Sequence, residues 1–194
     1  MEIVTKRFLL RDFVESDRLL FLNYQADPRT LTFYEPKEAS PEHAAHLFNL
    51  FQTWATDRPR LNYQLAITFG IAKLNVHRQA PDNLIGCCGL RGINRNGEME
   101  LGIELAPSYW GRYGYAIEVG CALLDFGFDQ LNLETISGFT VSANTRITKL
   151  AEWSGAKVVV VRSGATWMTE RGWSEVEWLL TKEQWRDRTD TRQI

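Results

Sequence analysis

The stretch that decides the fold is residues 98–129, EMELGIELAPSYWGRYGYAIEVGCALLDFGFD. Residues 98–105 alternate between apolar side chains and glutamate or glycine, a pattern typical of a strand with two different faces. Pro107 ends that strand, and from Ile117 onward apolar residues recur at helical spacing. The sequence therefore predicts a strand, a tight loop and a long helix in direct succession.

The loop between this strand and this helix contains Gly111 and Gly114. Glycine lets the backbone turn sharply and approach a ligand closely. The N-terminus of a helix also offers free backbone N–H groups and the positive end of the helix dipole, which together suit a phosphate. An ordinary strand-to-helix crossover with a glycine turn fits the same local pattern, so the loop alone leaves both interpretations open.

Length, composition and charge define the class of protein. The chain has 194 residues, 44% of them apolar, and a net charge of −2, which predicts one domain over residues 1–187 and a loose polar tail at 188–194. Acidic and basic residues are interspersed, so no basic block predicts nucleic-acid binding. No apolar run approaches the roughly 20 residues of a membrane span, and the charged N-terminus is not typical of a signal peptide. We expect a cytoplasmic protein with no nucleic-acid or membrane partner.

The cysteines and histidines give no catalytic or metal-binding pattern. The three cysteines are too few for a disulfide framework, and Cys87 and Cys88 are best interpreted as reduced core residues. His43 and His46 lie three residues apart on a predicted helix without a third ligand near them in the sequence. We therefore expect no metal and no acyl-cysteine intermediate.

The remaining segments complete an α+β order with a mixed sheet, antiparallel at first and parallel across the central helix. A run of four valines predicts that strand 157–162 is buried. Asn94 to Gly97 predict a hairpin turn, and residues 71–83 an exposed loop. Further strands are expected at residues 3–13, 62–69, 83–93, 133–141 and 173–181, and further helices from Val14, at 40–56, at 143–154 and from Lys182.

This order and several short motifs resemble the GNAT acyl-CoA N-acyltransferase superfamily, and in particular its RimJ/RimL-like branch. The resemblance covers nearly the whole chain and implies a layered α+β fold with a mixed, mostly antiparallel central sheet and helices on both faces. The motifs that carry it are TKRFLLR from Thr5, LIG from Leu84, ELGI from Glu100, GYA from Gly114 with Glu118, and Asn144 with Gly155.

The resemblance implies that acetyl-CoA is the co-substrate. Strand residues Ile103 and Leu105 would pair with the pantetheine arm, with an amide near Leu105 as oxyanion hole. Asn144 would contact the pantetheine amide or the diphosphate, unless it caps its helix, with Ser142 as its competitor. Backbone N–H groups of the loop would bind the diphosphate, and the loop residues are Gly111, Arg112, Tyr113, Gly114, Tyr115 and Ala116.

The chain departs from the family pattern at several places. Gly111 stands where the superfamily has Gln or Arg, and the pair Arg112-Tyr113 separates the glycines where the branch has one residue. Ile147 replaces a common Ser, and no Tyr near Ala151 offers a general acid. The resemblance therefore predicts acetyl-CoA as the co-substrate, but it identifies no residue that would protonate the departing CoA thiolate.

A carboxylate base on the central strand is the other implied group. The acceptor is an amine, either a protein N-terminal amine or a small-molecule amine, and it must be neutral to attack the thioester. A lysine amine is almost entirely protonated at pH 7, whereas an α-amine is neutral in roughly one molecule in ten. Glu100 and Glu104 lie on the same face of the predicted strand, so either is a candidate base, acting directly or through water.

Other functions are less consistent with these residues. A dinucleotide-binding oxidoreductase needs three glycines in the order Gly-x-Gly-x-x-Gly, which this loop does not have. A non-catalytic acyl-CoA-binding or regulatory domain on the same fold remains an alternative, as does an interaction protein that binds no CoA. Either a monomer or a homodimer is compatible with the sequence.

Overall fold

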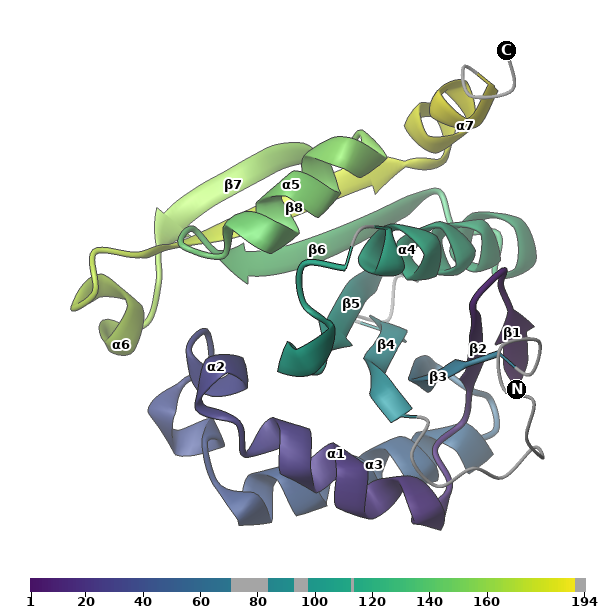
Figure 1. The fold of residues 1–194 in the computed structure, drawn as a ribbon. Helices are drawn as coiled ribbons and strands as arrows, with labels where there is room; N and C mark the ends of the chain where they lie inside the picture. The colour runs from purple at the N-terminus through teal and green to yellow at the C-terminus, as the bar shows by residue number, and fades with distance from the viewer. Residues whose placement is uncertain (71–83, 93–97, 113, 191–194) are drawn as a thin grey trace. The chain divides into compact units, whose positions relative to one another are not determined.

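The computed structural model describes residues 1–70, 84–92, 98–112 and 114–190. The predicted loop 71–83, the predicted turn 94–97 and Tyr113 lie outside these residues. Figure 1 labels the helices and strands. The strands are β1 Glu2–Val4, β2 Phe8–Arg11, β3 Asn62–Phe69, β4 Leu84–Gly92, β5 Met99–Leu105, β6 Thr135–Val141, β7 Lys157–Ser163 and β8 Ser174–Thr181. The α-helices are α1 Arg18–Gln25, α2 Pro28–Leu31, α3 Pro41–Thr56, α4 Tyr115–Asp125, α5 Thr145–Ser154, α6 Thr166–Thr169 and α7 Lys182–Asp190.

The strands form one mixed sheet in the order β1-β2-β3-β4-β5-β6-β8-β7. Among the described residues, β5 and β6 pair in parallel at Met99↔Ile136 and Glu100↔Ser137. The pairs β1–β2, β2–β3, β3–β4, β6–β8 and β7–β8 are antiparallel. The predicted mixed and mostly antiparallel sheet is therefore confirmed, including the parallel step across the central helix.

The contacts of the chain group into two compact units, which we describe separately. One unit contains Met1–Arg91 and Gly102–Ala122, and the other contains Gly92–Leu101 and Leu123–Ile194. Strand β5 and helix α4 each contribute residues to both units.

The first unit begins with a hairpin, not with the single strand predicted over residues 3–13. Strands β1 and β2 pair antiparallel, with Glu2 opposite Arg11. The turn closes where Thr5 N donates to Phe8 O at 2.9 Å and Phe8 N donates to Thr5 Oγ1 at 2.9 Å. The prediction was wrong here because the turn contains no glycine, proline or asparagine to interrupt the strand pattern.

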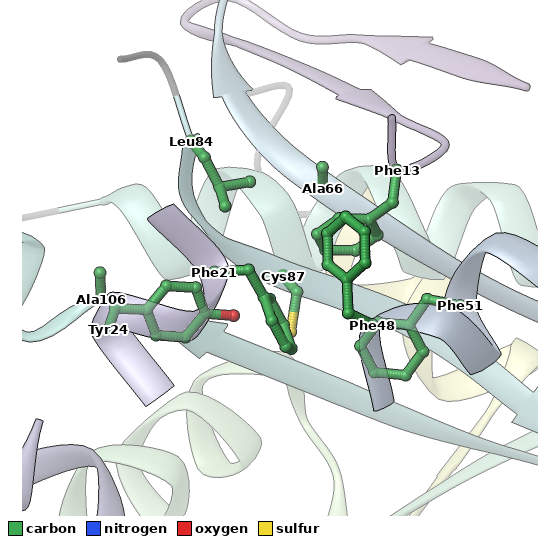
Figure 2. Packing of buried hydrophobic residues seen from close by; sticks show 9 residues of the cluster. All are labelled: Phe13, Phe21, Tyr24, Phe48, Phe51, Ala66, Leu84, Cys87 and Ala106. Atoms are coloured by element: carbon green, nitrogen blue, oxygen red, sulfur yellow. The ribbon is translucent and has the colours of Figure 1, made fainter. Parts of the chain in front are cut away.

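An aromatic cluster joins β3 and β4 to helices α1 and α3 in this unit. Phe48 of α3 is fully buried, with ring centroids 5.5 Å from Phe13 and 5.6 Å from Phe21. Ser40 caps α3 by accepting from His43 N at 3.1 Å, as the sequence predicted. Figure 2 shows the cluster, which consists of Phe13, Phe21, Tyr24, Phe48, Phe51, Ala66, Leu84, Cys87 and Ala106. Cys87 and Cys88 are buried core residues, as expected.

Helix α4 packs against other residues of the same unit. The Tyr115 ring meets the Phe8 ring edge-on, with 4.9 Å between their centroids. A Cβ atom on Gly120 would lie 3.5 Å from the Ile103 Cδ1 atom, an ordinary van der Waals distance, so α4 packs against β5 at this position. This packing fixes the first turn of α4 relative to β2 and β5.

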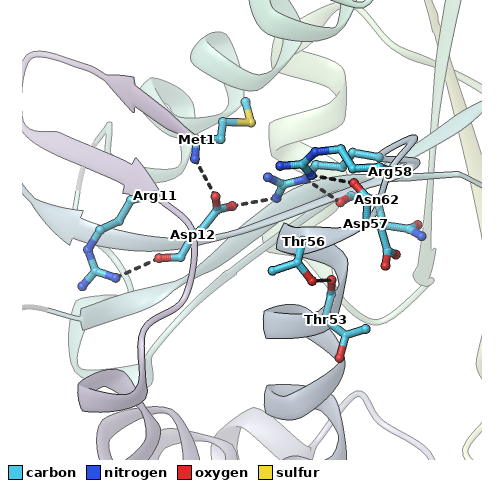
Figure 3. A network of polar contacts seen from close by, with 9 residues as sticks. Met1, Arg11, Asp12, Thr53, Thr56, Asp57, Arg58 and Asn62 are labelled. Atoms are coloured by element: carbon cyan, nitrogen blue, oxygen red, sulfur yellow. Dashed lines mark hydrogen bonds and ion pairs between the residues drawn. The ribbon is translucent and has the colours of Figure 1, made fainter.

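A polar network ties the end of β2 to the start of β3 (Figure 3). The Asp12 carboxylate accepts from the Met1 amino group at 2.5 Å and from Arg60 at 2.7 Å. Although burial alone would raise the pKa of Asp12, its bonds and attraction to Arg60 and to the terminal amine lower it below its ordinary value. The ionised carboxylate therefore stabilises this corner of the unit.

In the second unit, β8 lies between β6 and β7. The Trp185 indole of α7 donates to Asp125 Oδ1 at 2.8 Å. Helix α7 begins at Lys182, as predicted, and extends through residues 188–190, which we had expected to belong to the polar tail. Gly155 ends α5 in the left-handed region with φ 87°, as predicted for a C-cap.

Strand β7 is exposed, so the prediction of a buried strand was wrong. Val158, Val159 and Val161 are 46%, 49% and 64% exposed. The reason is topological, since β7 is the last strand in the order and pairs only with β8. A run of valines indicates β structure, but it does not distinguish an edge strand from a central one.

Candidate active site

The residues that precede α4 have the backbone geometry predicted for a close turn. Gly111 and Gly114 have φ values of 72° and 81°, which glycine adopts more easily than other residues. Tyr115 N donates to Arg112 O at 3.3 Å, and Glu118 N donates to Gly114 O at 3.0 Å. The other amides of the first turn have no acceptor within the helix, as at every helix N-terminus.

Arg7 and Glu118 hold this turn in place. Glu118 accepts from Arg7 N at 2.6 Å, from Arg7 Nε at 2.5 Å and from the Thr5 hydroxyl at 2.6 Å. Arg7 also donates from Nη2 to Gly114 O at 2.7 Å. One guanidinium therefore connects a carboxylate in the first turn of α4 to the carbonyl just before it.

The charge of Glu118 is compensated within this network. Although burial alone would raise the pKa of Glu118, its bonds from Thr5 and Arg7 lower the pKa below its ordinary value. The carboxylate is therefore ionised at neutral pH, and the positive charge of Arg7 balances it. Sequence reasoning included both residues only as parts of family motifs and did not pair them.

The other cofactor-binding candidates of the loop differ in accessibility. Gly111 and Arg112 are exposed, and a Cβ atom on Gly111 would meet nothing within 4 Å. The Arg112 guanidinium lies 5.7 Å from the centre of the Tyr109 ring. Ala116 is half-buried at the start of α4. The predicted role of Tyr113 concerns a residue outside the described part of the chain.

Strand β5 carries Ile103, Glu104 and Leu105. Ile103 faces α4, because it packs beneath Gly120. The Leu105 carbonyl accepts from the Trp110 indole at 2.7 Å, which folds the chain after β5 back onto its last residue. A Cβ atom on Gly86 would lie 2.1 Å from Glu104 O and 2.9 Å from Leu105 Cα, so β4 approaches this part of β5 at a distance that only glycine permits.

Glu104 lies in a polar cluster on the side of the sheet that carries Cys87. Its Oε1 atom accepts from Gln25 at the end of α1, and its Oε2 atom accepts from the Tyr34 hydroxyl. Burial raises the pKa of Glu104 above its ordinary value. The bonds from Tyr34 and Gln25, the Tyr24 hydroxyl and the charge of Arg91 limit that rise. A carboxylate with a raised pKa is a stronger base than an ordinary glutamate.

Two neighbours of Glu104 are themselves hard to ionise. Burial raises the pKa of the Cys87 thiol to about 12, and the charge of Glu104 adds to the effect. Burial also raises the pKa of Tyr24 well above its ordinary value. Among the described residues, the Tyr24 hydroxyl has no hydrogen-bond partner of normal geometry. Cys87 and Tyr24 therefore stay neutral, and Glu104 is the carboxyl group of this cluster, with its pKa raised by burial.

Glu100, the other candidate base, lies four positions earlier on β5. It is half-buried and stands opposite Ser137 in the parallel pairing with β6. Glu100 and Glu104 belong to different compact units. The structure thus gives the two carboxylates different surroundings, although the strand pattern alone does not separate them.

Asn144 occupies the N-cap position of α5 but does not cap it with its side chain. Its competitor Ser142 instead accepts from Ser174 N at 3.0 Å. Within the described part of the chain, the Asn144 Oδ1 atom is buried without a hydrogen-bond partner. A buried polar atom without a partner is costly, so this atom is suited to receive a donor from a ligand.

Among residues 1–70, 84–92, 98–112 and 114–190, no three His, Cys, Asp or Glu side chains converge in a way that could hold a metal ion. Of the helices in the described part of the chain, none combines the length and apolar character needed to cross a bilayer.

Comparisons with known proteins identify the family. Residues 7–157 match the family model of the acetyltransferase (GNAT) domain. The N-acetyltransferase p20 of Bacillus licheniformis is 26% identical over 149 residues, which cover 76% of this chain and 78% of that protein. The spermidine N-acetyltransferase of Vibrio cholerae, solved with CoA and spermine, has a TM-score of 0.72 at 19% identity and covers 92% of this chain and 97% of its own. The ribosomal-protein-S5-alanine acetyltransferase of Vibrio fischeri has a TM-score of 0.72 at 16% identity, with 95% and 98% covered. The chain belongs to the GNAT acetyltransferase domain family and is an acetyltransferase.

Proposed function

We propose that this protein transfers an acetyl group from acetyl-CoA to an amine, with Glu104 as the base that removes a proton from the acceptor. The observation that carries the proposal is the environment of Glu104. It is a carboxylate with a pKa raised by burial, and both of its oxygens are oriented by hydrogen bonds. We prefer Glu104 to Glu100 on this ground.

The residues around the Gly111–Gly114 turn fit a diphosphate. The turn combines two glycines of positive φ, an open side at Gly111 and the amides of the first turn of α4. We propose that Gly111, Arg112, Gly114, Tyr115 and Ala116 bind the diphosphate of acetyl-CoA, and we retain Tyr113 as a prediction.

Three further residues are proposed to contact acetyl-CoA, each argued within its own unit: Ile103 and Leu105 in the first and Asn144 in the second. Ile103 and Leu105 offer main-chain groups to the pantetheine arm, as a strand edge does to an added strand. Asn144 is included because its buried Oδ1 atom has no partner among the described residues. It would accept a hydrogen bond from an N–H group of the pantetheine arm.

The proposed reaction needs only acetyl-CoA, the acceptor amine and the Glu104 carboxylate. The acceptor ammonium gives one proton to Glu104, and its nitrogen then attacks the thioester carbon. As the C–N bond forms, the C–S bond breaks, and the CoA thiolate takes the second proton from the nitrogen. Acetyl-CoA supplies the activated acyl group, while the protein orients the reactants and accepts the first proton.

The acceptor is proposed as an amine of one of two kinds. Proteins of similar fold act on spermidine and on a ribosomal-protein alanine, according to their names. Both kinds of amine need deprotonation, and the polyamine needs it more because its amines have higher pKa values. The resemblance of the sequence to the RimJ/RimL-like branch favours a protein N-terminal amine.

A CoA-thiol release assay tests the function. The protein is mixed with acetyl-CoA and with N-terminal peptides, polyamines, amino acids or aminoglycosides in turn, and free thiol is measured. We expect acceptor-dependent thiol release with at least one class, and mass spectrometry should find the acetyl group on nitrogen. CoA binding without transfer to any amine would instead support the non-catalytic alternative.

Arg7→Ala is expected to weaken CoA binding about tenfold or more, because it releases the Gly114 carbonyl and leaves Glu118 uncompensated beside the diphosphate site. Isothermal titration calorimetry with CoA measures the effect. Lys6→Ala is the matched control, since Lys6 is the exposed cation next to Arg7. The double variant Arg7→Ala/Glu118→Gln should recover part of the affinity, and an unchanged Kd in Arg7→Ala would contradict the proposed role.

A further inference from the structure

The two oxygens of Glu104 are held by side chains from one short part of the chain. Gln25, the last residue of α1, donates to Oε1, and Tyr34, just after α2, donates to Oε2. The two donors are 79 and 70 positions from Glu104 in the sequence. Residues 25–34 thus supply both of these hydrogen-bond donors to the proposed base.

Hydrogen bonds hold residues 25–34 in place next to α1. Asp27 caps α2 by accepting from Arg29 N at 2.9 Å. The buried Thr30 hydroxyl donates to Tyr24 O at 2.9 Å, and Tyr34 N donates to Leu31 O at 3.1 Å. These bonds direct the Tyr34 hydroxyl to Glu104, while 39% of the residue surface stays exposed to solvent.

The two donors differ in what surrounds them. Gln25 is half-buried, whereas Tyr34 is the exposed member of the pair. The Tyr34 residue lies at the surface while its hydroxyl is buried against Glu104, so a movement of Tyr34 would open Oε2 to an acceptor that arrives from solvent. An ammonium donates a stronger, charge-assisted hydrogen bond to a carboxylate than a neutral phenol does.

We propose that Tyr34 is a positioning residue that holds Oε2 of Glu104 in the free enzyme and yields this oxygen to the acceptor ammonium. The inference rests on the proposed role of Glu104. In the exchange, the ammonium replaces the phenol as the donor to Oε2 and then passes its proton to that oxygen. Tyr34 keeps its own proton throughout, and Gln25 keeps Oε1 fixed.

The remaining groups around Glu104 determine how a change at Tyr34 is measured. The charged or titratable groups that act on the carboxyl are Tyr24 of α1, Tyr34, Cys87 of β4 and Arg91 of β4. Cys87 and the two phenols remain neutral near pH 7, because burial raises the pKa of each. The titration of Glu104 can therefore be followed without a change in the charge of these three groups.

The first test needs no substrate. The Glu104 carboxyl is followed by carbon NMR in protein with labelled glutamate, and its signal is assigned by its loss in Glu104→Gln. Because a hydrogen bond to the charged form lowers a carboxyl pKa, Tyr34→Phe should raise the pKa of Glu104 by about one unit. Tyr63→Phe is the matched control, because Tyr63 lies on β3 and its ring packs against the Arg60 guanidinium. An unchanged titration in Tyr34→Phe overturns the inference.

The second test separates the two donors. Tyr34→Phe and Gln25→Leu should both move the acidic limb of kcat/KM to higher pH. Above that limb, only Tyr34→Phe should lower the acceptor KM, since only Tyr34 competes with the ammonium. A KM that rises in Tyr34→Phe would overturn the exchange. Full activity in Glu104→Gln would instead refute the proposed base, so the two failures are distinguishable.

Discussion

Glu104→Gln is expected to lower kcat/KM for acetyl transfer by about 10²- to 10⁴-fold, the usual contribution of a general base. The amide keeps the size of the side chain and can still accept from Tyr34, but it cannot take a proton from the acceptor. The remaining activity should rise with pH, because only the neutral amine then reacts. Thiol release measured across the pH range in which the protein stays folded gives both quantities.

The raised pKa of Glu104 determines how the activity and the stability of the unmodified enzyme should change with pH. Glu104 must be ionised to act, so activity falls as the pH drops through its raised pKa. The same raised pKa means that the folded state binds this proton more tightly than the unfolded chain does. Its stabilising effect is present at low pH and is lost as pH rises through that pKa. Glu104→Gln should therefore lose activity without a lower free energy of unfolding at neutral pH.

Two other variants show whether the loss of activity is specific to Glu104. Glu2→Gln removes an exposed carboxylate from β1 and serves as the matched control, with kinetics expected to equal those of the unmodified protein. Glu100→Gln tests the other candidate on the same strand. If Glu100→Gln showed the large loss and Glu104→Gln did not, the base would be Glu100 and our choice would be wrong.

The central strand, loop and helix could be predicted because local chemistry decides them. The alternation in β5, Pro107 after it and the two glycines before α4 act within a few residues of one another. Strand β3 was predicted at the observed residues 62–69 for the same reason. The parallel step to β6 follows from the helix between the strands.

The partners of Glu104 could not be predicted, because they depend on distant parts of the chain. Gln25 and Tyr34 have no spacing relation to β5 in the sequence. Alternation places Glu100 and Glu104 on one face of the strand, but only their tertiary neighbours distinguish them. The exposure of β7 has the same origin, since strand order is decided by the whole sheet and not by the valines of one strand.

Phe48→Ala is expected to have the largest effect on folding, with a loss of about 3–5 kcal/mol in the free energy of unfolding. The Phe48 ring is fully buried and contacts Phe13 and Phe21, and the Arg18 guanidinium lies 4.4 Å from its centre. Removing it leaves a cavity and removes contacts with Phe21 of α1 and with Phe13, which follows β2. Since small domains have only about 5–15 kcal/mol of stability, such a loss is a large fraction of the total.

Urea unfolding followed by tryptophan fluorescence measures this loss, with Phe48→Leu as the milder truncation, whose cost should be smaller because it leaves a smaller cavity. A loss below about 1 kcal/mol in Phe48→Ala would contradict the packing described above.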